Sequence, residues 1–186
     1  NSSTPSMPGP FGVQRRPIPC SPGEVCALVE AGRWQEIKAI LRTSPDLAFD
    51  VDAEGCSAVF VAAECGQVDA LTTLLAAGAD PDAGGLDAMT PLFISAHAGN
   101  TPAVAALVAA GATVDLPAPD GVTAAFIAAQ EGHVDALRLL LGAKASVEAA
   151  GEDGATPLLV AAEQGHTSVA QELLRAKASP NRAKPD

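Results

Sequence analysis

Residues 90–100 read TPLFISAHAGN, and residues 156–166 read TPLLVAAEQGH. Both stretches begin with Thr-Pro, continue with small and apolar residues, and have a glycine at the tenth position. Outward from them, the same positions recur every 33 residues, with Ser57, Thr90, Thr123 and Thr156 at the start and Gly66, Gly99, Gly132 and Gly165 at the end. Four copies in register predict a repeat architecture.

Each copy is predicted to form two short helices and a turn. The Ser or Thr hydroxyl is expected to cap the first helix by accepting a free backbone N–H. Pro91 and Pro157 follow directly, at a helical position where a missing N–H costs nothing. Apolar residues at helical spacing within 68–75 predict the second helix.

The residue that ends the second helix of each copy is expected to adopt the left-handed conformation. Gly78 and Gly111 suit that place, because glycine adopts it without strain. Lys144 and Lys177 stand there in the later copies. We expect each lysine to cost up to about 1 kcal/mol relative to glycine.

These residues resemble the ankyrin repeat, which has the same period and a T-P-L-H-x-A signature. Residues 90–96 and 156–162 match it well, and residues 57–60 and 123–126 match it more weakly. An apolar residue replaces the signature His in every copy, namely Phe60, Phe93, Phe126 and Leu159. The resemblance implies an all-α fold, a solenoid of antiparallel helix pairs joined by hairpin-like loops.

The chain divides into four parts by this interpretation. Residues 52–182 are expected to hold four ankyrin repeats, and residues 23–51 a degenerate N-terminal capping repeat. Trp34 is expected to pack this cap onto the first full repeat. Residues 183–186 are a C-terminal tail.

Residues 1–22 differ from the rest in composition. They hold six of the 15 prolines, so an extended, polyproline-like segment is predicted. Its expected anchors to a host complex or to the chain's own repeats are Phe11, Val13, Arg15, Arg16 and Ile18. The first residue is Asn1 and not Met, as expected of a processed chain or of part of a longer protein.

The charge of the chain limits its partners. The formal net charge is −11, and residues 52–179 contain 16 acidic and 4 basic residues. Such a surface disfavours binding to nucleic acid or to anionic lipid. No apolar stretch reaches the roughly 18–20 residues of a membrane span. The expected partner is therefore a protein with a basic surface.

In ankyrin proteins the concave side binds partners, through the hairpin tips and the first helices. The resemblance therefore implies three kinds of contact position in each repeat. They are the residue just before the capping Ser or Thr, the turn residues, and the two residues that follow the Ala-Ala pair of the first helix. The predicted partner-binding residues are Asp52, Glu54, Glu64, Leu86, Asp87, Met89, His97, Asp120, Val122, Gln130, Glu131, Glu152, Asp153 and Glu163. Cys56, Met89, Val122 and Ala155 would form a weakly apolar spine between the carboxylates.

Two interpretations of these residues remain open. One is a groove that attracts a basic peptide electrostatically. The other is turn formation, as expected for Asp120 and Asp153 before glycine, together with solubility. His97 is expected to be uncommitted, whereas the resemblance gives His133 and His166 a structural role.

Catalytic and metal-binding motifs are not found in the sequence. There is no Gly-rich phosphate loop, no convincing nucleophile–base set, no Cys-x-x-Cys pair and no His at zinc spacing. We predict no enzyme activity, no cofactor and no metal. The four cysteines are expected to be free thiols in a reducing compartment. A helix between Cys56 and Cys65 would hold them about 13 Å apart, which exceeds the limit of roughly 7 Å for a disulfide between these two.

The sequence leaves four roles open. They are an interaction module, a structural subunit held permanently in a large organellar complex such as a photosynthetic one, an assembly chaperone, and an ankyrin segment of a larger signalling protein or enzyme. The expected location is a reducing intracellular compartment, either the cytosol or the interior of an organelle, plastids included.

Overall fold

The computed structural model describes residues 23–85, 89–151 and 154–181. The expected anchors in residues 1–22, the tail 183–186, and Leu86, Asp87, Glu152 and Asp153 lie outside these ranges. The described helices are α1 (Glu24–Glu30), α2 (Trp34–Thr43), the 3-10 helix η1 (Pro45–Phe49), α3 (Ala58–Glu64), α4 (Val68–Ala76), α5 (Pro91–His97), α6 (Thr101–Ala109), α7 (Ala124–Gln130), α8 (Val134–Gly142), α9 (Pro157–Glu163) and α10 (Thr167–Arg175).

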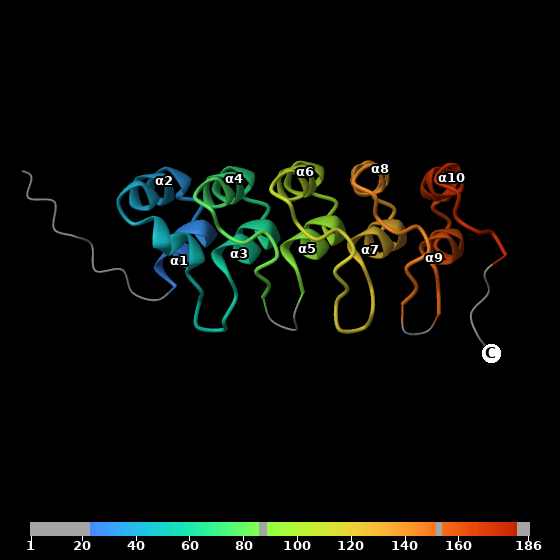
Figure 1. Ribbon diagram of the computed structural model, residues 1–186, viewed down its shortest axis with the longest axis horizontal. Helices are drawn as coiled ribbons and strands as arrows, with labels where there is room; N and C mark the ends of the chain where they lie inside the picture. Colours follow the sequence, from blue (N-terminus) through green and yellow to red (C-terminus); the bar gives the residue numbers. More distant parts are fainter. Residues whose placement is uncertain (1–22, 86–88, 152–153, 182–186) are drawn as a thin grey trace, which may run out of the picture.

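The helices form two parallel rows (Figure 1). The odd-numbered helices α1 to α9 make the inner row, from which the hairpin loops project, and the even-numbered helices α2 to α10 make the outer row. Each helix packs on its pair partner and on the equivalent helix of the next pair. The predicted all-α solenoid of stacked helix pairs is confirmed for the described residues.

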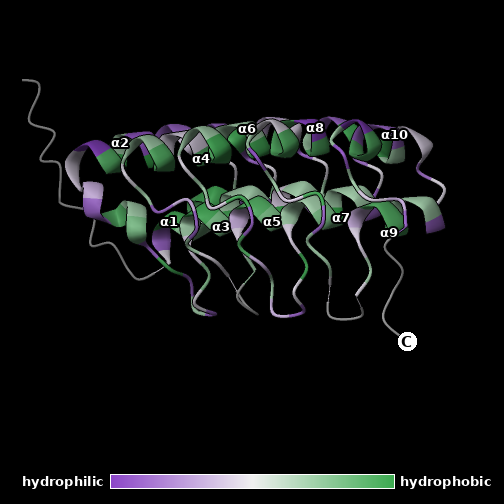
Figure 2. Ribbon diagram, turned by 45° about the vertical axis from the view of Figure 1, so that its right-hand side comes forward, coloured by the Kyte–Doolittle hydropathy of each residue, from purple (hydrophilic) through white to green (hydrophobic). Residues whose placement is uncertain are grey.

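One apolar core runs along the whole array, from Val25 to Ala178. Helices α3, α5, α7 and α9 are mainly hydrophobic (Figure 2), since they pack on neighbours along the row as well as on the outer helices. Because each pair buries its surface only against adjacent pairs, the stability of the array depends on these interfaces.

The first helix pair is tied to the array at its start. The carboxylate of Asp50 accepts hydrogen bonds from the backbone N–H groups of Gly23 and Val25, both at 2.9 Å. Trp34 is half-buried and packs against the core. The chain therefore enters α1 beside the loop that follows η1.

The inner helices begin as the sequence predicts. The hydroxyl oxygens of Ser57, Thr90, Thr123 and Thr156 accept backbone N–H groups of Phe60, Phe93, Phe126 and Leu159 at 3.0–3.3 Å. All four capping residues are buried. Each cap thus satisfies one N–H group that has no partner within the helix.

The later outer helices end with lysine in the left-handed conformation expected at these positions, and the energetic cost stays a prediction. Lys144 and Lys177 have φ angles of 73° and 70°, in the same region as Gly78 and Gly111 at 93° and 91°. The Schellman-type hydrogen bonds form even so, with Ala145 N–H donating to the Leu140 carbonyl at 2.9 Å.

Ser95 in α5 carries an unsatisfied hydroxyl. Its side chain is fully buried, and its Oγ has no hydrogen-bond partner in the described part of the chain. The equivalent residues of the other inner helices are Ala62, Ala128 and Ala161. We expect Ser95→Ala to raise the free energy of unfolding by about 1–2 kcal/mol, because a buried polar group without a partner is destabilising. Urea unfolding followed by circular dichroism measures this change, and an unchanged or lower midpoint would contradict it.

Candidate functional site

The ends of the inner helices present a row of polar residues. We call this set the inner-helix row, and it consists of Glu64, Cys65, His97, Ala98, Gln130, Glu131, Glu163 and Gln164. All are exposed except Gln130, which is half-buried. In α3 and α7 the buried residues stop at Ala63 and Ala129, so the residues at the C-terminal end of the helix reach the surface.

Two of the predicted partner-binding carboxylates accept hydrogen bonds from backbone N–H groups within their own turns. The Oδ1 atom of Asp52 accepts from the N–H groups of Glu54 and Cys56 at 3.0 and 2.8 Å. The Oδ1 atom of Asp120 accepts from the N–H of Val122 at 3.2 Å. These contacts agree with the turn interpretation of Asp120 and extend it to Asp52.

A second set of carboxylates, none of them among the predicted partner-binding residues, joins successive repeats. Asp82, Asp115 and Glu148 accept from the backbone N–H groups of Thr113, Ser146 and Ser179, with shortest distances of 2.9, 2.9 and 2.6 Å. Their 33-residue spacing was the signal that could have revealed them. These three acidic residues are therefore part of the fold.

The expected apolar spine is only partly exposed. Cys56 and Ala155 are buried, so the prediction that they line a contact surface is wrong. Both precede a buried capping residue, and the turn directs them into the core. Met89 and Val122 are half-buried and pack against the core. Their partner-binding role stays a prediction.

His133 and His166, which follow Gly132 and Gly165, link neighbouring repeats. Nε2 of His133 lies 3.0 Å from the carbonyl oxygen of His97, and Nε2 of His166 lies 2.9 Å from that of Gln130. The structural role expected for His133 and His166 is confirmed. The imidazole of His97 is exposed, in agreement with an uncommitted side chain.

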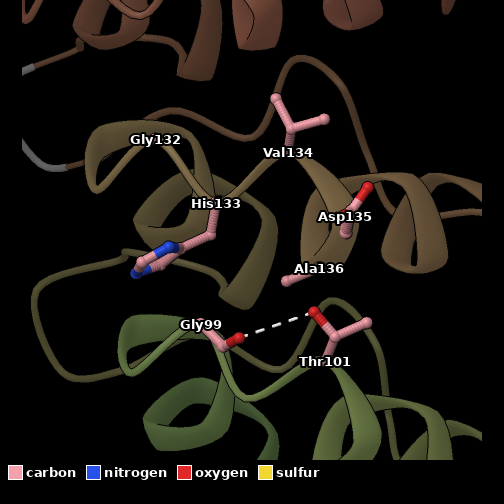
Figure 3. Close-up of a pocket in the computed structure, with 7 residues that line it drawn as sticks. All are labelled: Gly99, Thr101, Gly132, His133, Val134, Asp135 and Ala136. Atoms are coloured by element: carbon pink, nitrogen blue, oxygen red, sulfur yellow. Dashed lines mark hydrogen bonds between the residues drawn. The ribbon is translucent and has the colours of Figure 1, made fainter.

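Shallow depressions lie beside these histidines (Figure 3). One, of about 300 Å³, is lined by Gly99, Thr101, Gly132, His133, Val134, Asp135 and Ala136. A second, of about 400 Å³, is lined by Gly132, Val134, Gly165, His166, Thr167, Ser168 and Val169, the equivalent positions one repeat later. The two depressions are equivalent places in successive repeats. Asp135 is the one carboxylate that lines the first, and no carboxylate lines the second.

No cluster of three or more His, Cys, Asp or Glu residues suited to a metal ion occurs among residues 23–85, 89–151 and 154–181. The carboxylates are spread along the array, with the period of the repeat.

The cysteines in the described ranges are free thiols. Burial, and then the negative charges of Asp50, Asp52 and Glu30, raise the pKa of Cys26 from 9.0 to about 12. The pKa of Cys65 is also raised, by partial burial and then by Glu64 and Glu30. Above pH 9 the unfolded Cys26 thiol loses a proton that the folded chain keeps, so this group lowers stability as the pH rises from 9 towards 12.

The exposure of the thiols predicts their reactivity. In a Cys20→Ser variant at pH 8, we expect one equivalent of thiol, that of exposed Cys65, to react quickly with Ellman's reagent. Buried Cys26 and Cys56 should react only after urea is added. The Cys20→Ser, Cys65→Ser double variant is the control, since it should lose the fast phase. Rapid reaction of three equivalents in the native chain would contradict the structure.

These features define a helical repeat protein: stacked helix pairs, capped inner helices, and the contacts of His133 and His166 between repeats. Comparison with known families gives matches to three ankyrin repeats over residues 92–184 and to a further ankyrin repeat over residues 54–85. The chain belongs to the ankyrin repeat family.

No individual curated protein matches the chain. None of the helices in the described ranges combines the length and the apolar character needed to cross a bilayer.

Proposed function

We propose that this chain is a non-catalytic binding module whose inner-helix row docks a basic peptide or the basic surface of a protein. Ankyrin repeats form protein–protein interaction modules, and the family is generally non-catalytic. The observation that carries the proposal is the distribution of carboxylates that the fold itself does not use.

The acidic residues fall into groups with different surroundings. Asp52 and Asp120 hold turns. Asp82, Asp115 and Glu148 join repeats, and Glu172 pairs with Arg138 and Arg175 on the outer row.

The inner-helix row is different. Glu64 and Glu163 are exposed and accept no side-chain hydrogen bond in the described part of the chain, and Glu131 accepts only one, from its neighbour Gln130 at 3.1 Å. These carboxylates contribute little to the fold.

Electrostatics support a basic partner. The row has three carboxylates and no lysine or arginine, and it lies on a repeat region with 16 acidic and 4 basic residues. A field of one sign accelerates the encounter with an oppositely charged partner, and added salt weakens it. Exposed Cys65 and Ala98 between the charges leave room for apolar side chains of the partner.

Charge reversal tests the proposal. The probe is a randomised peptide library enriched in Arg and Lys, compared with an acidic library of equal length. We expect the full chain to retain basic peptides. A triple variant should bind them more weakly, and it combines Glu64→Lys, Glu131→Lys and Glu163→Lys. Three exposed pairs at about 0.5 kcal/mol each predict an increase in Kd of about tenfold or more.

The matched control reverses three exposed carboxylates of the outer row, Glu36→Lys, Asp69→Lys and Asp135→Lys, which changes the net charge equally. Both variants should keep the helical circular dichroism of the parent. Equal loss of affinity in both would indicate a net-charge effect, and unchanged affinity in the first variant would remove the proposed site.

A further inference from the structure

The loop after η1 carries an exposed apolar patch among acidic residues. Phe49 is 62% exposed and Val51 is 45% exposed, the former being the most exposed large hydrophobic side chain in the described ranges. Asp46 and Glu54 are exposed beside them in the sequence. We call Asp46, Phe49, Val51 and Glu54 the first-loop patch.

Local geometry explains why this patch faces outward. The backbone is extended at Asp50, so its side chain and those of its neighbours leave on opposite sides. The Asp50 carboxylate turns inward to the N–H groups of Gly23 and Val25, both at 2.9 Å. Phe49 and Val51 are left towards solvent, where large apolar side chains are unfavourable unless something covers them.

Gly23, the first residue that the structure describes, lies next to the first-loop patch. A Cβ atom on Gly23 would lie 3.3 Å from the Asp52 Cα and 3.6 Å from the Val51 carbonyl oxygen. The residues that precede Gly23 are therefore attached next to the first-loop patch. At about 3.1 Å per residue in an extended chain, Ile18 is within roughly 16 Å of Gly23 and Arg15 within roughly 25 Å.

The two segments are complementary in composition. Residues 1–22 contain Arg15 and Arg16 and no acidic residue, whereas residues 45–54 contain four acidic residues and no basic one. Apolar side chains stand on both sides of the arginine pair, at Val13 and Ile18. The N-terminal segment is thus apolar and basic in composition, and the first-loop patch is apolar and acidic.

We propose that residues 11–18 dock on the first-loop patch of the same chain. The apolar side chains of this segment cover Phe49 and Val51, and Arg15 and Arg16 pair with the flanking carboxylates. Covalent attachment gives the segment an effective concentration in the millimolar range, so a weak contact suffices for high occupancy. The docked segment covers the first loop of the array, a role independent of partner binding at the inner-helix row.

Trypsin cleavage between Arg15 and Arg16 in the full chain tests this proposal. Cleavage requires an accessible segment, so its rate follows the undocked fraction. We expect Phe49→Ser to accelerate cleavage by about tenfold, which corresponds to roughly 90% docking in the parent chain. Phe49 is exposed, so this substitution should leave the helical circular dichroism unchanged.

Leu174→Ser is the matched control, because Leu174 is an apolar residue 48% exposed in α10, in the last helix pair of the array. It should leave the cleavage rate unchanged. A second measurement, hydrogen–deuterium exchange of residues 46–54, should show faster exchange in the Arg15→Glu, Arg16→Glu variant of the full chain.

The outcomes separate the alternatives. Faster cleavage in Phe49→Ser alone, independent of protein concentration, supports docking within one chain. Equal rates in the parent and Phe49→Ser, or protection that rises with protein concentration because a second copy supplies the segment, would overturn the proposal.

Discussion

Replacing Gly99 by alanine is expected to lower the free energy of unfolding by about 2–3 kcal/mol. Gly99 has a φ of 65°, and a left-handed residue with a Cβ costs about 1–2 kcal/mol. Its added Cβ would lie 2.6 Å from Nδ1 and 2.7 Å from Cε1 of His133. The imidazole must move, which breaks its 3.0 Å contact with the His97 carbonyl oxygen and costs about 1 kcal/mol more.

Two glycines of the same chain provide matched controls. Gly66 has a φ of 68°, and its nearest neighbour to an added Cβ is Asn100 Nδ2 at 3.4 Å. Gly165 has a φ of 77° and no atom within 4 Å of an added Cβ. Alanine at either position should cost only the backbone strain, about 1–2 kcal/mol. Urea unfolding that gives equal losses for all three variants would show that the His133 contact contributes nothing.

Leu140→Ala is expected to destabilise the array by about 3 kcal/mol. The side chain is fully buried in the continuous core, and a buried Leu→Ala change loses both transfer free energy and packing around the cavity. Because core contacts pass from pair to pair, the cavity in α8 weakens its interfaces with α7 and with neighbouring outer helices.

Leu139 on the same helix is the control for this substitution. It is 36% exposed, so Leu139→Ala should cost less than about 1 kcal/mol. The comparison holds helix, side chain and helix propensity constant and varies only burial. Denaturant midpoints that differ by less than the experimental error would contradict the placement of Leu140 in the core.

The acidic residues that produce the net charge of −11 fall into two groups with different contacts. Carboxylates such as Asp82 and Asp115 accept backbone N–H groups of the next repeat and help to hold the array together. Carboxylates such as Glu64 and Glu163 project from the inner row without such a contact in the described part of the chain. Substitutions in the first group should change stability, and those in the second group should change binding.

The sequence was sufficient to predict the helix starts and the left-handed helix ends. Ser57 and Thr90 cap their helices through N–H groups three residues away, and Lys144 closes a turn with carbonyls of the same helix. Such features depend on neighbours along the chain, so the residue type and the 33-residue period predict them.

The roles of individual carboxylates and of the spine residues required the tertiary structure. Thr113, the partner of Asp82, lies 31 residues away, and the burial of Cys56 and Ala155 depends on how one repeat stacks on the next. The 33-residue period marks Asp82, Asp115 and Glu148 as equivalent positions, but it does not identify the backbone groups that they contact in the next repeat. That outcome follows from packing in three dimensions, where turn direction and the close approach of small residues decide what is buried and what faces solvent.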